Sequence, residues 1–169
     1  GLECGGTDAF SGIAANPSIG ITSDILISHG GSAIFSEITE LLGAEKILME
    51  HCVNKKVAEL LLKVIKKTEI ELAISISNPN YKKRSNLIST GNFSGGVSTV
   101  VEKALGNIEK AGKSPIKGVL KFAETIPGKG LFLMDTPGQD GESTTGLVAG
   151  GAQIILFTTG RGTPTGFPI

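Results

Sequence analysis

Residues 1–12 carry side chains that could do chemistry within a backbone rich in glycine. The thiol of Cys4 and the carboxylate of Asp8 stand among hydroxyl groups and glycines, with few bulky apolar side chains. Glycine adopts positive φ angles and lets another group approach the backbone closely. Polar side chains interspersed with glycines are typical of a ligand site and uncommon in a buried strand. We therefore predict that this segment forms part of a site.

Two later segments have the same character. The first is 90–96, and the second combines Asp135–Gly138 with the stretch 158–162, in which Arg161 lies between two glycines. A guanidinium offers paired donors to a planar anion, so Arg161 is a candidate for holding a substrate carboxylate. We predict that the rest of the chain brings these segments to one edge of the fold.

Each of these candidates also has a purely structural interpretation. A free cysteine such as Cys4 is often a small buried hydrophobe, and Asp8 fits a turn or a helix cap as well as a site. Glu37 follows a predicted strand, yet a glutamate that opens a helix also complements the helix dipole. Arg161 could be a plain surface residue. His29 precedes two glycines, where the dipole at a helix C-terminus favours it over a role as a metal ligand.

The spacing of a second motif excludes a nucleotide-hydrolysing site. Asp135–Gly138 resemble the magnesium-side motif of a GTPase, and Lys113 and Ser114 follow Gly112 as they would in a phosphate loop. Such a loop requires a glycine five residues before Gly112, where Asn107 stands. The segment also ends a predicted helix instead of opening one.

Composition limits the remaining classes of function. The 169 residues suit one domain, and 16 acidic residues balance 16 basic ones. The charge pattern of a nucleic-acid binder is therefore missing, and the basic run 82–84 is expected to be an exposed loop. No apolar run reaches the roughly 20 residues that cross a bilayer. With no export signal, we expect Cys4 and Cys52 to be free thiols in a cytoplasmic protein.

Hydrophobic periodicity predicts strands that alternate with helices. Helices are expected at 16–29, 37–49, 54–68, 97–108 and around 147–149, and strands at 32–36, 119–123, 131–134 and 153–157. Residues 72–76 fit either a continued helix or a short strand. The alternation predicts an α/β fold, with a mostly parallel sheet and helices on both faces in a Rossmann-like three-layer arrangement. Ligands bind such sheets beyond the carboxyl ends of the strands, where Glu37, Asp135 and Arg161 are expected.

Several motifs, in order along the whole chain, resemble one known family. They are Gly1–Gly12, Ala15–Pro17, Phe35–Glu37, Gly91-Asn92 with Gly95-Gly96, Glu102–Gly106, Met134–Gly138, Ala149–Ala152 and Phe157–Gly162. These stretches resemble the altronate dehydratase and galactarate dehydratase family, and the sulfolactate sulfo-lyase large subunit is similar too. The resemblance implies that residues 1–169 are a single domain from the C-terminal region of a longer sugar-acid dehydratase.

The family resemblance also implies a reaction. Such a lyase removes water from a sugar acid to give a 2-keto-3-deoxy acid, assisted by a divalent metal, Fe²⁺ or else Mn²⁺. The expected partners are a small sugar acid, the N-terminal domain of the same enzyme and further copies in a homo-oligomer, with no nucleic acid and no membrane. Two other functions stay open: sulfo-lyase chemistry on the same scaffold, and a non-catalytic domain that binds a sugar acid or mediates assembly.

Roles for individual residues follow from matching this chemistry to the motifs. Dehydration needs a base, an acid and an electrophile that holds the substrate carboxylate. The candidate catalytic residues are Asp8, Glu37, Asp135 and Arg161. The candidate metal ligands are Cys4, Asp8 and Glu37, with Cys4 as a soft ligand to iron. The candidate substrate-binding residues are Gly5, Gly6, Thr7, Asn16, Asn92, Gly95, Gly96, Thr136, Thr158 and Thr159.

Overall fold

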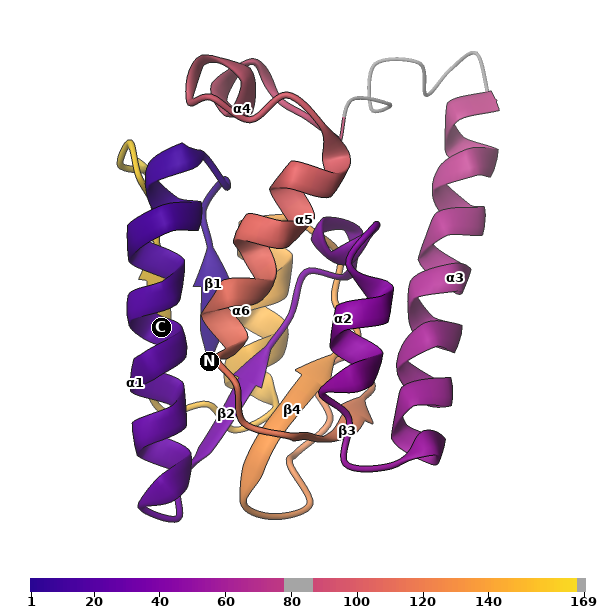
Figure 1. Cartoon of the computed structure of the whole chain (residues 1–169), viewed down its shortest axis with the longest axis vertical. Coiled ribbons are helices and arrows are strands. Elements are labelled where there is room, and N and C mark those ends of the chain that lie inside the picture. The colour runs from indigo at the N-terminus through magenta and orange to yellow at the C-terminus, as the bar shows by residue number, and fades with distance from the viewer. Residues whose placement is uncertain (78–86, 167–169) are drawn as a thin grey trace.

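A five-stranded parallel sheet forms the centre of the chain (Figure 1). The computed structural model describes residues 1–77 and 87–166. The strands follow one another across the sheet in the order β3-β4-β2-β1-β5, and each neighbouring pair is parallel. Their bounds are β1 Leu2–Cys4, β2 Ser32–Phe35, β3 Ile116–Leu120, β4 Gly130–Met134 and β5 Leu156–Thr158. The predicted parallel α/β sheet is confirmed.

Helices connect the strands and cover both faces of the sheet. The α-helices are α1 Asn16–Ser28, α2 Glu45–Glu50, α3 Lys55–Ser77, α4 Thr90–Ser94, α5 Val100–Ile108 and α6 Asp140–Ala149. Shorter turns are the π-helix η1 Ser11–Ala15 and the 3₁₀-helices η2 Ile38–Leu41 and η4 Glu109–Ala111. Helices α1, α2, α3 and α5 pack on one face, and α6 lies behind the sheet in Figure 1.

Alternating side chains of the strands supply a core on each face. Phe35, Leu131 and Leu133 belong to the larger buried cluster with α2, α3 and α5. Ile34, next to Phe35, and Phe132, between Leu131 and Leu133, belong to a second buried cluster with α6. Successive side chains of a strand point to opposite faces of the sheet. When both faces are covered, each strand therefore has a continuous run of apolar residues in its sequence. These central strands therefore have the pattern of a three-layer fold.

One close approach fixes helix α1 against the rest of the fold. A Cβ at Gly20 would collide with the carbonyl oxygen of Glu109 and approach the backbone of Gly112. Gly112 itself has a φ of 76° and ends the turn η4, as expected of a glycine at a helix C-terminus. Glycine at both positions lets the two backbones lie side by side.

The single helix predicted for 37–49 is wrong. Glu37 adopts a left-handed conformation (φ 72°), the 3₁₀-helix η2 follows, and Gly43 (φ 98°) separates it from α2. Ile38 of η2 and Leu48 of α2 both belong to the buried core, so the apolar pattern continues across a break in the backbone at Gly43.

Several other boundaries differ from the prediction. Strand β3 begins three residues earlier than expected and β5 is displaced toward its C-terminal side, while 72–76 continue helix α3. The glycine-rich segment 90–96 contains the short helix α4, and α6 begins at Asp140. Helix α5 starts at Val100, because the side chains of Thr99 and Glu102 form a capping box. The basic run 82–84 lies outside the described residues.

No helix in the described ranges has the length and apolar character needed to span a bilayer.

Candidate active site

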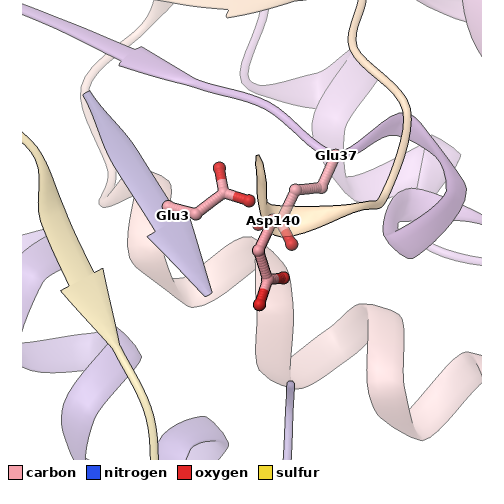
Figure 2. Close-up of side chains that lie close together, drawn as sticks. All are labelled: Glu3, Glu37 and Asp140. Atoms are coloured by element: carbon pink, nitrogen blue, oxygen red, sulfur yellow. The ribbon is translucent and has the colours of Figure 1, made fainter. Parts of the chain in front are cut away.

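Three carboxylates from distant parts of the chain meet near the carboxyl ends of the central strands. Glu3 is on β1, Glu37 follows β2, and Asp140 opens helix α6; one oxygen from each lies within 4.8 Å of the others. Figure 2 shows these side chains lying close together, each on a different part of the fold. Of the three, only Glu37 was among the residues that the motifs predicted.

Glu3 is held by two hydroxyl groups on the α6 side of the sheet. Its Oε2 accepts hydrogen bonds from Ser36 Oγ at 2.9 Å and Ser143 Oγ at 2.8 Å. Its Oε1 is buried and has no hydrogen-bond partner in the described part of the chain. Burial raises the pKa of Glu3 to about 7, although Lys110 and the two hydroxyls act in the opposite direction.

Glu37 owes its position to its unusual backbone. The left-handed conformation is anchored by Thr136, whose Oγ1 accepts the Glu37 N–H at 2.9 Å and whose carbonyl accepts the Ile38 N–H at 3.2 Å. The carboxylate turns inward, where its Oε2 accepts the Cys4 N–H at 3.0 Å. A non-glycine residue with positive φ is a strained feature that commonly marks a functional position.

A fully buried ion pair joins this carboxylate to Lys110. The Lys110 ammonium donates to Glu37 Oε2 and to Asn107 Oδ1, the latter at 2.8 Å. Burial raises the pKa of Glu37 well above its usual range, against the effect of the ammonium. Burial alone would lower the pKa of Lys110, but Glu37 and Glu3 outweigh it and raise that pKa. The Oε1 of Glu37 has no hydrogen-bond partner among the described residues.

A second polar chain leads from this cluster toward the surface. Cys4 Sγ lies 3.4 Å from Thr7 Oγ1, which donates to Glu40 Oε2 at 3.3 Å. The other oxygen of Glu40 pairs with Lys103 Nζ at 2.8 Å, and these two side chains are 7% and 13% exposed. An incoming molecule can therefore reach the Glu40–Lys103 pair more readily than the buried Glu37–Lys110 pair.

Asn16 links three of the predicted segments. Its amide donates to the carbonyl oxygen of Gly106 at 2.8 Å and to Cys4 Sγ at 3.6 Å, while its Oδ1 accepts the hydroxyl of Thr158. The thiol of Cys4 is thus buried within a hydrogen-bonded network, and both cysteines are free.

Of the predicted segments, 90–96 and 158–162 meet the first one at Asp8, whereas Gly138 of the segment Asp135–Gly138 lies against Thr39. A Cβ at Gly95 or at Gly160 would collide with the Asp8 side chain, so both loops need glycine to approach it. Asp8 itself makes a local turn, because its Oδ1 accepts the N–H of Ser11 at 2.8 Å. The Nδ2 of Asn92 donates to the carbonyl of Thr7 at 2.6 Å.

The other predicted glycines and Thr159 lie on the same edge. The N–H of Gly5 donates to the carbonyl of Thr158, and Gly6 and Gly96 have φ angles of 99° and 91°. Thr159 Oγ1 accepts two backbone N–H groups of the loop after β5. These residues shape the edge of the sheet with their backbones.

Two predicted residues stand apart from the carboxylate cluster. Asp135 pairs with Lys67 of α3 at 3.5 Å. Arg161 is exposed and donates to the carbonyl of Gly91 at 3.0 Å and to the hydroxyl of Ser94, so it ties the loop after β5 to α4. Both lie at the predicted edge, and their roles in substrate binding or catalysis stay predictions.

The motif analysis missed six residues of this site. They are Glu3, Glu40, Lys103, Asn107, Lys110 and Asp140. Glu3 stands beside Cys4 in the first motif and could have been considered with it. Lys110 follows Asn107 by three residues near a helix end, a spacing that puts both on one face of the helix, but nothing in the sequence marks that face as buried.

The donor set of the cluster is suited to a metal ion. Buried oxygens without partners belong to two carboxylates, and the third carboxylate is half-buried beside them. Buried polar atoms are nearly always paired in native proteins, and carboxylate oxygens are ligands of divalent cations. The residues therefore fit the metal that the family resemblance implies.

Comparison with known proteins identifies the family of this chain. The family described as D-galactarate/Altronate dehydratase, C-terminal, matches residues 1–169. The altronate dehydratase of Bacillus subtilis (strain 168) is 46% identical over 98% of this chain, which covers 32% of that protein. The galactarate dehydratase (L-threo-forming) of Escherichia coli (strain K12) is 43% identical over 98% of this chain, covering 31% of that protein.

A third relative carries a different name. The (2R)-sulfolactate sulfo-lyase subunit beta of Chromohalobacter salexigens is 36% identical over 99% of this chain, covering 42% of that subunit. The chain therefore spans about a third of the length of the dehydratases and less than half of the sulfo-lyase subunit. With the family match over every residue, the chain belongs to the D-galactarate/altronate dehydratase C-terminal family.

Proposed function

We propose that this chain is the part of a sugar-acid hydro-lyase that carries its proton-transfer groups, acting on altronate or galactarate. The observation that carries the proposal is the gathering of buried and nearly buried ionisable side chains, among them the Glu40–Lys103 pair, at the carboxyl edge of the sheet. Ligands bind parallel α/β sheets at this edge, and clusters of ionisable groups in such positions are candidates for catalysis. The names of the relatives support the substrate class.

Removing water from a sugar acid requires two proton movements. A base takes the proton from the carbon beside the carboxylate, and the electron pair left behind forms a carbon–carbon double bond as the neighbouring C–O bond breaks. The departing hydroxyl takes a proton to become water. The resulting enol then tautomerises to the 2-keto acid. Proton transfer by positioned side chains accelerates such steps by about 10²–10⁴-fold.

Glu40 and Lys103 are placed to perform these transfers. They are the most accessible of the paired charges near the cluster, and their atoms are 2.8 Å apart. We assign the base to the Glu40 carboxylate and the donation to the leaving hydroxyl to the Lys103 ammonium. Thr7, which donates to the second oxygen of Glu40, fixes the orientation of that carboxylate.

The remaining groups bind and orient the substrate. Arg161, at the same edge, carries the exposed guanidinium that would hold a substrate carboxylate. A divalent metal bound by the carboxylate cluster would supply an electrophile for the substrate's carboxylate or leaving hydroxyl. Glu37 and Lys110, both fully buried, stabilise the edge on which these groups stand.

The test is turnover of altronate and of galactarate by the complete polypeptide that contains this chain, supplied with Fe²⁺ or Mn²⁺. Formation of the 2-keto acid is followed for the wild type and for the variants Glu40→Gln and Lys103→Met. We expect each variant to reduce kcat at least 100-fold, in line with the loss of one proton-transfer group. Lys46→Met, which removes an exposed lysine of α2, is the matched control and should be neutral.

Full activity of both variants would remove the proton-transfer assignment. A complete polypeptide that binds a sugar acid but does not turn it over would instead favour the non-catalytic alternative.

Sulfo-lyase chemistry is the second candidate, because the sulfo-lyase subunit matches 99% of the chain. That reaction also removes a proton beside a carboxylate, but sulfite leaves in place of hydroxide. Release of sulfite from sulfolactate, with no turnover of either sugar acid, would favour it over the dehydratase.

A further inference from the structure

We propose that Glu3, Glu37 and Asp140 are the ligands of one divalent metal ion, and that Cys4 and Asp8 are not ligands. The proposal deepens the function proposed above, since it names the residues that hold the metal. Metal binding can be measured without any substrate, so it can fail or succeed independently of the reaction.

The geometry brings the three carboxylates within reach of a single ion. One oxygen of each lies within 4.8 Å of the other two, and carboxylate oxygens bind divalent cations at about 2.0–2.6 Å. Three separate elements fix the positions: a strand, the strained residue after a second strand, and the first turn of α6. The rigid sheet therefore supports two of the three ligands.

Two buried oxygens lack the partners that burial normally requires. Oε1 of Glu3 and Oε1 of Glu37 are both without a hydrogen bond in the described chain, and both side chains have no exposed surface. Leaving a buried charged acceptor unpaired is strongly unfavourable. In each residue the other oxygen is already occupied, by hydroxyls in Glu3 and by Lys110 and a backbone N–H in Glu37. The free oxygens are thus the ones available to a cation.

The charge of the cluster matches a divalent ion. Carboxylates bind a metal in their deprotonated form. With a metal bound, the three carboxylates would carry three negative charges, and the Lys110 ammonium, bonded to Glu37, compensates one of them. A cation of charge two would balance the rest. A ligand set made only of carboxylate oxygen favours oxygen-preferring ions such as Mn²⁺ and Mg²⁺ over ions that prefer sulfur or imidazole.

The earlier candidates Cys4 and Asp8 are occupied elsewhere. The thiol of Cys4 is in contact with Thr7 and Asn16. The carboxylate of Asp8 caps its own turn at Ser11 and packs against the glycine loops. Neither residue belongs to the group of three converging ligands.

Asp140 is the residue through which the site can be tested without unfolding the protein. It is half-buried at the start of α6 and makes no ion pair with any of the described residues, whereas Glu37 pairs with a fully buried lysine. Glu142 lies two residues further along the same turn and is exposed. Glu142→Gln therefore makes the same change of charge in the same helix without touching the cluster.

The experiment is a titration of the chain with Mn²⁺ followed by electron paramagnetic resonance, in which free Mn²⁺ gives a six-line signal that disappears on binding. We expect one bound Mn²⁺ per chain, at least a ten-fold weaker Kd for Asp140→Asn, and an unchanged Kd for Glu142→Gln. Glu3→Gln, which keeps the shape of the side chain, should weaken binding similarly. Circular dichroism confirms that each variant is folded.

The proposal is overturned if the wild type binds no Mn²⁺ up to millimolar concentration, or if Asp140→Asn and Glu142→Gln bind it equally well. It is equally overturned if Cys4→Ser or Asp8→Asn abolishes binding while Asp140→Asn retains it. If Mn²⁺ binds as expected but no sugar acid is turned over, the metal site stands and the proposed reaction fails.

Discussion

Carboxylates at the two ends of the sheet differ in how completely their oxygens are hydrogen-bonded. At the end where β3 begins, Asp24 of α1 accepts hydrogen bonds from the N–H of Lys113 and from the N–H and hydroxyl of Ser114. At the carboxyl ends of the strands, Glu3 and Glu37 are buried, and each keeps one oxygen without a partner in the described residues.

The pKa values of these carboxylates shift in opposite directions. Burial raises the pKa of Asp24, but the hydroxyl of Ser114 and the two N–H groups outweigh it, and the net pKa is lowered. For Glu3 and Glu37, burial is the largest influence and the pKa values are raised. The hydrogen bonds to Asp24 stabilise the loop before β3. Buried acceptors without partners are rare in native proteins, and they are expected where a bound ligand would supply the missing partner.

The largest expected effect comes from the buried ion pair. Lys110→Met leaves the Glu37 carboxylate buried and uncompensated, and we expect it to lower the free energy of unfolding by about 3–5 kcal/mol. Urea denaturation measures this value. The double variant Lys110→Met with Glu37→Gln should recover part of the loss. A single variant as stable as the wild type would show that the pair is not buried as described.

The pH dependence of Glu3 should be the next largest effect. Its pKa rises from 4.5 to about 7 on folding, so between these values the folded state binds more protons than the unfolded state. Stability from this group is therefore complete below pH 4.5 and is lost as the pH rises to 7, by up to about 3 kcal/mol.

Glu3→Gln isolates this contribution. In the presence of a chelator, the variant should match the wild type near pH 4.5 and have the higher melting temperature at pH 8. If the melting temperatures of the two proteins changed equally with pH between 4.5 and 8, the raised pKa of Glu3 would be contradicted.

The contact between the glycine loops and Asp8 should give a moderate effect. Gly160→Ala places a Cβ against the Asp8 carboxylate, and we expect it to lower stability by about 1–3 kcal/mol, as overpacking does. Gly128→Ala is the control, since no atom lies within 4 Å of a Cβ there. Equal stabilities of the two variants would show that the loops do not meet at Asp8.

The smallest effect is expected at the opposite end of the sheet. Asp24→Asn keeps one acceptor oxygen but removes the charge that strengthens the hydrogen bonds from Lys113 and Ser114, so we expect stability to fall by about 1 kcal/mol in total. Because the pKa of Asp24 is lowered on folding, its contribution is present above pH 3.8 and is lost as the pH falls through the folded pKa. The loss of stability in Asp24→Asn should therefore shrink in acid. Its sign is opposite to that of Glu3→Gln, which is expected to be more stable than the wild type at high pH.

The sequence predicted the layers of the fold and the edge that carries the site better than it predicted the site itself. Apolar runs such as 131–134 identify buried strands by pattern alone, and glycines at Gly95 and Gly160 mark backbones that approach closely. The helix break at Gly43 was missed, because the periodicity of 37–49 continues across it. Helix propensity and apolar periodicity do not predict a turn that is required by tertiary packing.

The missed site residues share one physical reason. In the sequence, a lysine at a helix end such as Lys110 cannot be distinguished from a solvent-exposed lysine, because its burial depends on which elements pack over it. Asp140 likewise looks like an acidic residue that complements the helix dipole. Only the meeting of β1, the segment after β2 and α6 reveals that these charges surround Glu37.

The most direct test of the account is the anomalous diffraction of crystals of this chain soaked in Mn²⁺. We predict one strong anomalous peak in contact with carboxylate oxygens of Glu3, Glu37 and Asp140, at about 2.0–2.6 Å from each. A peak at Cys4 or Asp8, or no peak at the carboxyl edge of the sheet, would contradict the account.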